Sequence, residues 1–193
     1  VNLLKDDAQQ MCIDVDDFDM FSLGEAIREA KRTAQIVALS AVKYGDLSNQ
    51  ASKDYVFDID RFTSFEGDTG PYILYTIVRI KSILEKYAAS EGSVENITTG
   101  VNKTLTPSEK NLMMELAKFN ATIDSAYEEL APYKICAYIY DLSNAFNRFY
   151  HETKIMGEED AQKQASYIAL LVLTQKVLEN CIDVLGFEAP ERM

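Results

Sequence analysis

The stretch FEGDTGPYILYTIVR, Phe65–Arg79, joins a turn to the start of a helix. Its two glycines and Pro71 are typical of a turn followed by a first helical turn, where proline is tolerated. Asp68 or Thr69 is suited to cap the helix, because a short polar side chain accepts a hydrogen bond from an otherwise free backbone N–H. The stretch therefore predicts a helix that continues to about Ala89.

This helix has two different faces. Its apolar residues fall within a sector of roughly 80°, at ~100° per residue: Ile73, Ile77, Ile80, Leu84 and Tyr87. A second set lies roughly a quarter to half a turn away: Tyr72, Tyr75, Arg79 and Lys86. Tyrosine rings and planar guanidinium groups bind the unstacked bases of single-stranded RNA. Two explanations stay open: an RNA-binding face, or ordinary packing under a neighbouring helix.

The region before this stretch predicts a long helix behind an acidic loop. Residues 14–21 carry an acidic run that favours a solvated loop. Gly45 is a stop signal for the helix that follows, and alternating apolar and acidic residues favour a short extended segment near residues 54–60. The three aspartates of that segment lack EF-hand spacing, so no metal site is expected. Helical periodicity gives the long helix an apolar face formed by Leu23, Ile27, Ala30, Ala34, Val37, Ala41 and Tyr44.

The region after the stretch predicts further helices. Residues 90–105 form a polar connection. The TPSE that begins at Thr106 is typical of a capping box with proline in the first helical turn, and it predicts the start of a helix or a helix pair. Pro132 opens another helix, and Gly157 separates it from a last helix at about residues 158–185. The expected core faces of these two helices are Ile135, Ile139, Leu142, Phe146 and Phe149 in the first, and Ala161, Ala165, Ile168 and Val172 in the last.

The composition fits a globular all-α protein. With 193 residues, 47% of them hydrophobic, the chain can form one helical bundle plus a lead-in segment. Its three cysteines lack metal-ligand spacing, which favours reduced thiols and a cytoplasmic location. No basic stretch followed by an apolar one opens the sequence, so we expect no secretion, and no apolar run approaches the roughly 18 residues that span a membrane. Because it starts at Val1 rather than Met, we expect it to be a piece of a longer protein.

The net charge of −12 excludes one class of function. A protein that binds DNA or other nucleic acid non-specifically neutralises many phosphates with a basic surface, and this chain has no such excess of bases. Any RNA partner must therefore be bound through local groups and stacking.

Three blocks of the sequence resemble the arginyl-tRNA synthetases. AVKYGDLSNQASKDYVFDIDRFTSFEGDTGPYILYTIVRIKSIL (Ala41–Leu84) resembles the segment that leaves their catalytic core and enters the anticodon-binding helices. LSNAFNRFYHETKI (Leu142–Ile155) resembles the FNxFY signature of that domain, and VLGFEAPERM (Val184–Met193) resembles the family's C-terminus. The blocks occur in the family's order.

The resemblance implies a class I synthetase whose helical bundle is of the DALR anticodon-binding type. Residues 1–66 would be a lead-in from the end of the catalytic core, and residues 67–193 the anticodon-binding domain. The implied partners are tRNA-Arg and the catalytic domain of the same protein. Matched residue by residue, the implied anticodon contacts are Tyr72, Tyr75, Arg79, Tyr150 and Met193. Weaker candidates, for phosphate contacts, are Lys86, Arg148 and Lys154.

The chain lacks the catalytic signatures of that family. Its one histidine, His151, excludes a His-Ile-Gly-His motif, and no Lys-Met-Ser-Lys-Ser loop is present. We therefore expect no catalytic residues and no cofactor here, with ATP and magnesium bound by the parent enzyme's catalytic domain, and we expect His151 to be a surface or packing residue. The alternative is an acidic helical module for protein–protein interaction. It would have the face of Tyr72, Tyr75 and Arg79 covered by a helix rather than exposed beside Tyr150.

Overall fold

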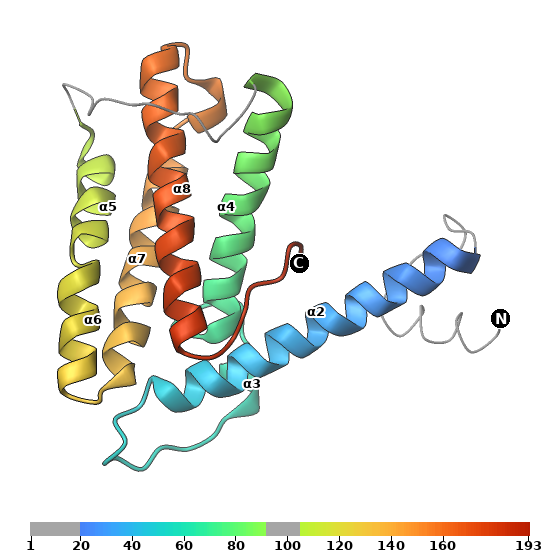
Figure 1. The fold of residues 1–193 in the computed structure, drawn as a ribbon, viewed down its shortest axis with the longest axis vertical. Helices are drawn as coiled ribbons and strands as arrows, with labels where there is room; N and C mark the ends of the chain where they lie inside the picture. Colours follow the sequence, from blue (N-terminus) through green and yellow to red (C-terminus); the bar gives the residue numbers. More distant parts are fainter. Residues whose placement is uncertain (1–19, 92–104) are drawn as a thin grey trace.

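The computed structural model describes residues 20–91 and 105–193, and within these residues it is all-α, without strands. The elements are α2 (Met20–Leu47), α3 (Ile59–Phe62), α4 (Gly70–Glu91), α5 (Pro107–Ala117), α6 (Phe119–Glu128), α7 (Pro132–Glu152), the 3₁₀ helix η2 (Ile155–Gly157) and α8 (Ala161–Val184). Helices α4 to α8 stand side by side as a bundle, and α2 crosses its foot and extends away from it (Figure 1). The predicted helical bundle is confirmed.

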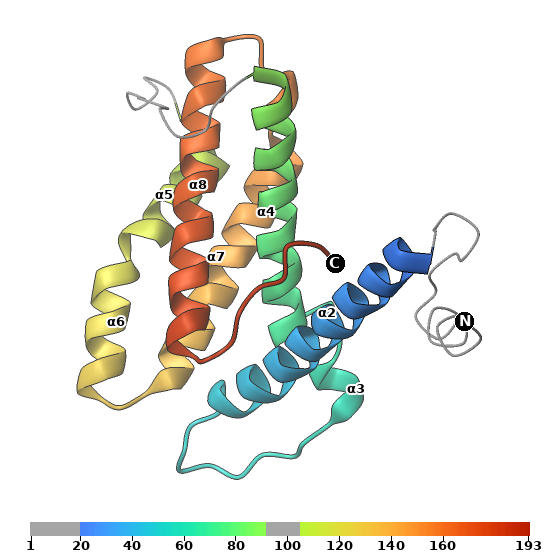
Figure 2. The same cartoon turned by 45° about the vertical axis from the view of Figure 1, so that its right-hand side comes forward.

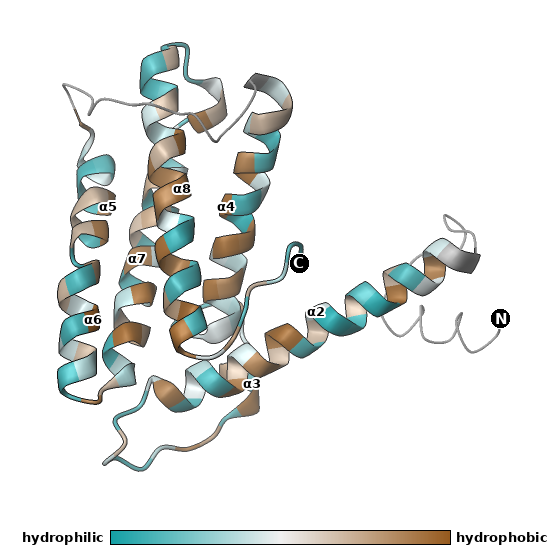
Figure 3. Ribbon diagram, in the orientation of Figure 1, coloured by the Kyte–Doolittle hydropathy of each residue, from teal (hydrophilic) through white to brown (hydrophobic). Residues whose placement is uncertain are grey.

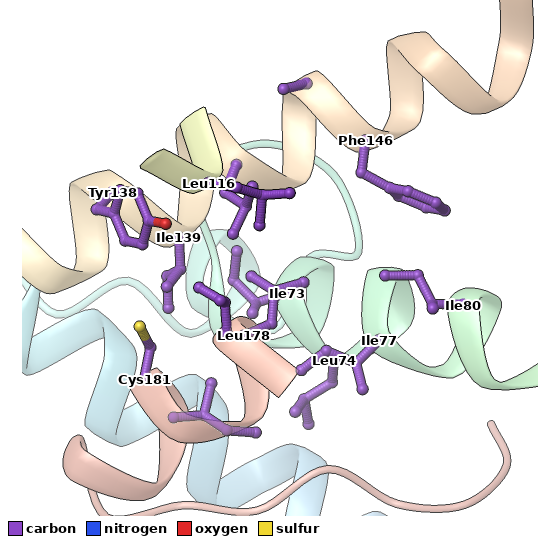
Figure 4. Packing of buried hydrophobic residues seen from close by; sticks show 14 of the residues in the cluster. Ile73, Leu74, Ile77, Ile80, Leu116, Tyr138, Ile139, Phe146, Leu178 and Cys181 are labelled. Atoms are coloured by element: carbon purple, nitrogen blue, oxygen red, sulfur yellow. The ribbon is translucent and has the colours of Figure 1, made fainter. Parts of the chain in front are cut away.

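The core lies between α4, α7 and α8. All five residues of the face predicted for α7 are buried, and Ile73, Ile77 and Ile80 of α4 are fully enclosed. Figure 4 shows Ile73, Ile139 and Leu178 gathered between the three helices, and Figure 3 shows hydrophobic residues along α4 and α8. Because full burial of such a side chain stabilises by about 1.5–3 kcal/mol, this core fixes α4 against α7 side by side.

The ends of the helices follow the predicted chemistry. Thr106 and Glu109 form a capping box, with Thr106 Oγ1 3.2 Å from the backbone N of Glu109 and Glu109 Oε2 2.8 Å from that of Thr106. For α4 the cap is Thr69, whose Oγ1 accepts from the backbone N–H of Tyr72 at 3.2 Å. At the end of α8, Gly186 takes a φ of +81°. The N–H groups of Gly186 and Phe187 bond back to carbonyls of the last turn, as in a Schellman motif.

Asp68, the other candidate cap, helps to join α2 to the bundle instead. The hydroxyl of Tyr44, a fully buried residue of α2, lies 2.5 Å from Asp68 Oδ1 and 3.0 Å from the backbone oxygen of Cys136 in α7. Burial and the Asp68 carboxylate raise the pKa of the Tyr44 phenol. One side chain thus links α2, the turn before α4, and α7.

Several predictions of local structure were wrong. Gly45 does not end α2, which continues to Leu47. A Cβ at Gly45 would lie 2.7 Å from the ring of Phe62, so the absence of a side chain leaves the space that this ring occupies. Residues 54–58 of the predicted extended segment lie outside any helix or strand, and Asp58 has an extended backbone, but residues 59 and 60 belong to α3, which Asp58 caps. Residues 20 and 21 of the predicted acidic loop belong to α2, and residues 90 and 91 of the predicted connection belong to α4. Residues 14–19 and 92–104 lie outside the described residues.

Two predicted core faces were only partly right. In α2, Ala34 is exposed while Ile36 is buried, and in α8 only Ile168 of the predicted four is buried. Helix α8 contacts α4, α5 and α7, so it buries residues around much of its circumference. The residues that it buries completely or nearly so are Tyr167, Ile168, Leu171, Thr174, Leu178, Cys181 and Ile182.

The buried thiols give a prediction about alkaline pH. Burial raises the pKa of Cys136 and of Cys181 to about 12. An unfolded cysteine ionises at pH ~8.5, whereas the native state keeps these thiols protonated. Their contribution to the free energy of unfolding is therefore complete below that pH and is lost as the pH rises above it. The free energy of unfolding, measured with urea from pH 8.5 to 10.5, should fall by up to about 1.4 kcal/mol per pH unit for each thiol. Replacing Cys181 by alanine should remove the part of this pH dependence that comes from one thiol. An unchanged dependence of the free energy of unfolding on pH would contradict the prediction.

Candidate nucleic-acid interface

Two exposed tyrosines and one arginine meet where α4 lies beside α7. The Cζ atom of Arg79 lies 4.6 Å from the ring centroid of Tyr75 and 5.3 Å from that of Tyr150. Tyr75 is 41% exposed and Tyr150 37%. The rings of Tyr150 and the fully buried Phe146 stack with centroids 6.1 Å apart, which supports Tyr150 from the core side. This Tyr75–Arg79–Tyr150 cluster offers aromatic and guanidinium surfaces to solvent.

The guanidinium of Arg79 is held at both ends. Its Nη1 donates to Asn147 Oδ1 at 2.8 Å, and its Nη2 donates to the Tyr75 hydroxyl at 2.9 Å. Five N–H donors radiate from a planar guanidinium, so two bonds from different nitrogens fix its plane and leave other donors for a ligand. The arginine is therefore oriented before any ligand binds.

Tyr72 lies beside this cluster but binds the protein. Its hydroxyl donates to Asn144 Oδ1 at 2.7 Å and accepts from Asn147 Nδ2 at 2.9 Å. The ring is half-buried against Tyr140, with centroids 5.9 Å apart, and burial raises the pKa of the Tyr72 phenol. Tyr72 thus joins α4 to α7, and its predicted contact with RNA stays a prediction.

Sequence reasoning missed Asn144 and Asn147, which complete this polar chain. Asn147 is the asparagine of the FNxFY block, so a signal for it was present. What the sequence alone did not supply was the partner: an amide that bonds residues of α4 acquires its role only once α4 and α7 are side by side.

The predicted phosphate contacts divide into two groups. Lys86 and Lys154 line one hollow of about 650 Å³ at the end of α7, together with Tyr150 and His151. Arg148 points elsewhere: it lies roughly 200° around the helix from Tyr150 and pairs with Glu152 at 3.0 Å, which lowers the pKa of that carboxyl. The structure therefore brings the two lysines, but not Arg148, to the hollow beside Tyr150.

His151 is exposed, as expected for a surface residue. Its ring packs edge-on against Tyr150, with centroids 5.7 Å apart.

Met193 is the predicted contact that lies apart from the cluster. The tail after α8 passes between α2 and the bundle (Figure 2), where Lys81 of α4 binds Glu191 at 2.8 Å and Glu179 of α8 at 3.4 Å. Residue 81 is roughly 200° around α4 from Arg79. Met193, 43% exposed, lines an apolar groove with α2 and Phe65. Its role in RNA contact stays a prediction.

The family model described as the DALR anticodon binding domain matches residues 73–193. The chain belongs to the DALR anticodon-binding domain family. The match lies inside the region predicted as the anticodon-binding domain, and its start at residue 73 places all but the first turn of α4 within the family's domain. The boundary at residues 66 and 67 stays a prediction.

This DALR chain is similar to arginine–tRNA ligases. It is 68% identical over 165 residues to the arginine–tRNA ligase of Agathobacter rectalis and 54% identical to that of Alkaliphilus oremlandii, covering 86% of this chain in both cases. The chain spans 28% of the length of these two curated relatives. Solved structures agree: all of this chain matches arginyl-tRNA synthetases from Thermus thermophilus (32% of that chain, 27% identity) and Plasmodium falciparum (33% of that chain, 25% identity), each with a TM-score of 0.74.

Two other kinds of site are absent from the described part of this DALR chain. None of its helices there is long and apolar enough to cross a membrane. No three metal-ligating side chains gather among the described residues.

Proposed function

We propose that this chain recognises the anticodon of tRNA-Arg as part of an arginine–tRNA ligase. The observation that carries the proposal is the exposed Tyr75–Arg79–Tyr150 cluster, in a chain of the DALR family with relatives named arginine–tRNA ligase. The alternative, a protein-interaction module, required these side chains to be covered by a helix. Tyr75 and Tyr150 are instead exposed beside each other.

The cluster suits the bases of a single-stranded loop. Loop bases splay outward and stack on aromatic rings or guanidinium planes, while hydrogen bonds read their edges. Tyr75 and Tyr150 supply the rings, and Arg79 supplies donors held in place between them. Lys86 and Lys154 flank Tyr150 on one side, where they would meet the phosphates of the same loop.

The remaining features of the parent enzyme follow from this role. The whole protein would join arginine to tRNA-Arg with ATP and magnesium bound in its catalytic domain, and would act in the cytoplasm on RNA rather than on DNA. Because the chain carries a net charge of −12 and binds through local groups and stacking, the isolated domain should bind RNA weakly.

The direct test is binding to an anticodon stem-loop of tRNA-Arg. Tyr75→Ala and Tyr150→Ala should each lower the affinity about tenfold, since a base stacked on an aromatic ring contributes roughly 1–3 kcal/mol. Fluorescence anisotropy at low salt measures this, with Tyr127→Ala as the control because Tyr127 is 80% exposed on α6. Equal affinity for this stem-loop and one with a changed anticodon would contradict the proposal.

A further inference from the structure

Asn147 occupies the centre of the hydrogen-bond chain between α4 and α7, and it uses both ends of its amide. Its Oδ1 accepts from Arg79 Nη1 at 2.8 Å, and its Nδ2 donates to the Tyr72 hydroxyl at 2.9 Å. The Tyr72 hydroxyl passes its own hydrogen on to Asn144 Oδ1 at 2.7 Å. Each donor in the chain therefore meets an acceptor. Because a guanidinium can only donate, Arg79 by itself requires that the Oδ1 of Asn147 face it.

The hydrogen bond to Asn147 Oδ1 holds the Nη1 of Arg79 in place. Without it the guanidinium would keep one hydrogen-bonded side chain, Tyr75, whose hydroxyl lies 2.9 Å from Nη2. A group held by one bond rotates about it, and its plane no longer stays aligned between Tyr75 and Tyr150, whose ring centroids lie 4.6 and 5.3 Å from Cζ. Orientation of the remaining donors matters because hydrogen bonds weaken steeply when misaligned.

We infer that Asn147 is a positioning residue that sets base specificity: its amide orients Arg79 so that the free donors of the guanidinium read the edge of one loop base. The inference rests on the proposed function, and it assigns the discrimination between bases to the Arg79–Asn147 pair rather than to the rings alone. The rings tolerate every base, because every base has a face on which to stack. The oriented N–H donors of Arg79, in contrast, bind only a base that presents hydrogen-bond acceptors at matching positions.

Asn144 supplies a matched control for this role. It is the same residue type, one helical turn earlier on α7, and it accepts from the Tyr72 hydroxyl, whereas Arg79 donates to Asn147 and Tyr75. A structural effect of weakening the contact between α4 and α7 should appear in variants of both asparagines. An effect that passes through Arg79 should appear in Asn147 variants alone.

The measured quantity is the ratio of affinities for the tRNA-Arg anticodon stem-loop and the same stem-loop with one changed anticodon base. Asn147→Leu should lower this ratio about tenfold, as expected for a lost hydrogen bond to a charged group, while Asn144→Leu should leave it within about twofold of the unmodified chain. Asn147→Asp should restore most of the ratio, because its carboxylate still accepts from Arg79, although the added negative charge weakens binding to both RNAs.

A double substitution separates the possible outcomes. In an Arg79→Ala background, Asn147→Leu should not change the ratio further, since a residue that acts through Arg79 has nothing left to position. Independent, additive effects would overturn the inference, as would an unchanged ratio in folded Asn147→Leu protein while Tyr75→Ala still weakens binding. If neither the tyrosine nor the Arg79 variants alter binding, the proposed function itself fails, and the inference fails with it.

Discussion

Replacing Gly70 with alanine is expected to lower the free energy of unfolding by about 3 kcal/mol, the upper end of the usual range for overpacking. Gly70 is the first residue of α4, at the point where α4 meets α2. A Cβ atom there would lie 2.3 Å from the backbone oxygen of Ser40, 2.6 Å from its carbonyl carbon and 3.1 Å from the backbone nitrogen of Ala41. Backbone atoms inside a helix cannot rotate away as a side chain can, so the two helices must separate.

Separation of these helices would also expose buried groups. Ser40 and Thr69 are enclosed on either side of this crossing, and the hydroxyl of Tyr44 makes its contacts with Asp68 and Cys136 from the same end of α2. Loss of partners for buried polar groups costs about 1–3 kcal/mol each. The effect of the alanine should therefore exceed that of a clash with a flexible side chain.

The control is the same substitution at Gly24 in α2. A Cβ there would meet only the end of the Arg28 side chain at 3.9 Å. Alanine inside a helix is favoured over glycine by about 0.5–1 kcal/mol, so Gly24→Ala should leave stability unchanged or raise it. Urea unfolding followed by far-UV circular dichroism compares the two. A Gly70→Ala protein as stable as the unmodified chain would show that the crossing has room for a methyl group.

Local sequence signals predicted the fold well where the apolar residues of a helix fall on one face. All five core residues assigned to α7 are buried, because α7 has solvent along one side and a 3.6-residue period therefore separates the faces. The same reasoning gave only Ile168 correctly in α8. Apolar residues are spread around much of the circumference of α8, so its sequence offers more than one apolar stripe, and the contacts with α4, α5 and α7 decide which residues are buried. Contacts that are distant in sequence, such as that of Gly45 with Phe62, decide such details.

The candidate site was predictable in its exposed part. The period of α4 placed Tyr75 and Arg79 off the core face, and the FNxFY block supplied Tyr150; the structure brings these three together. The sequence did not separate Tyr72 from them, because its hydroxyl is taken up by two asparagines of another helix. The position of Met193 depends on the tail contacts of Lys81, which no local pattern indicates.

Arg79→Ala should weaken binding of the tRNA-Arg anticodon stem-loop about 100-fold, which corresponds to about 2.7 kcal/mol and exceeds the effect expected for either tyrosine alone. The substitution removes three things at once: the donors proposed to bind the base, the local positive charge, and the group that contacts both rings. Each cation–π contact contributes about 0.5–1 kcal/mol at an exposed site. Without Arg79 the Tyr75 hydroxyl also loses its hydrogen-bond donor.

Arg79→Lys separates charge from shape. Lysine keeps the positive charge, but a single ammonium cannot reproduce a planar fork bonded to Asn147 and Tyr75 from two different nitrogens. We therefore expect lysine to recover less than about tenfold of the lost affinity, by its charge alone. Arg28→Ala is the control for charge, because Arg28 is an exposed residue of α2. Full recovery by lysine would mean that Arg79 acts only by attracting phosphates. Salt would then abolish the difference between the variants, because the attraction of phosphates is screened and the alignment of a guanidinium plane is not.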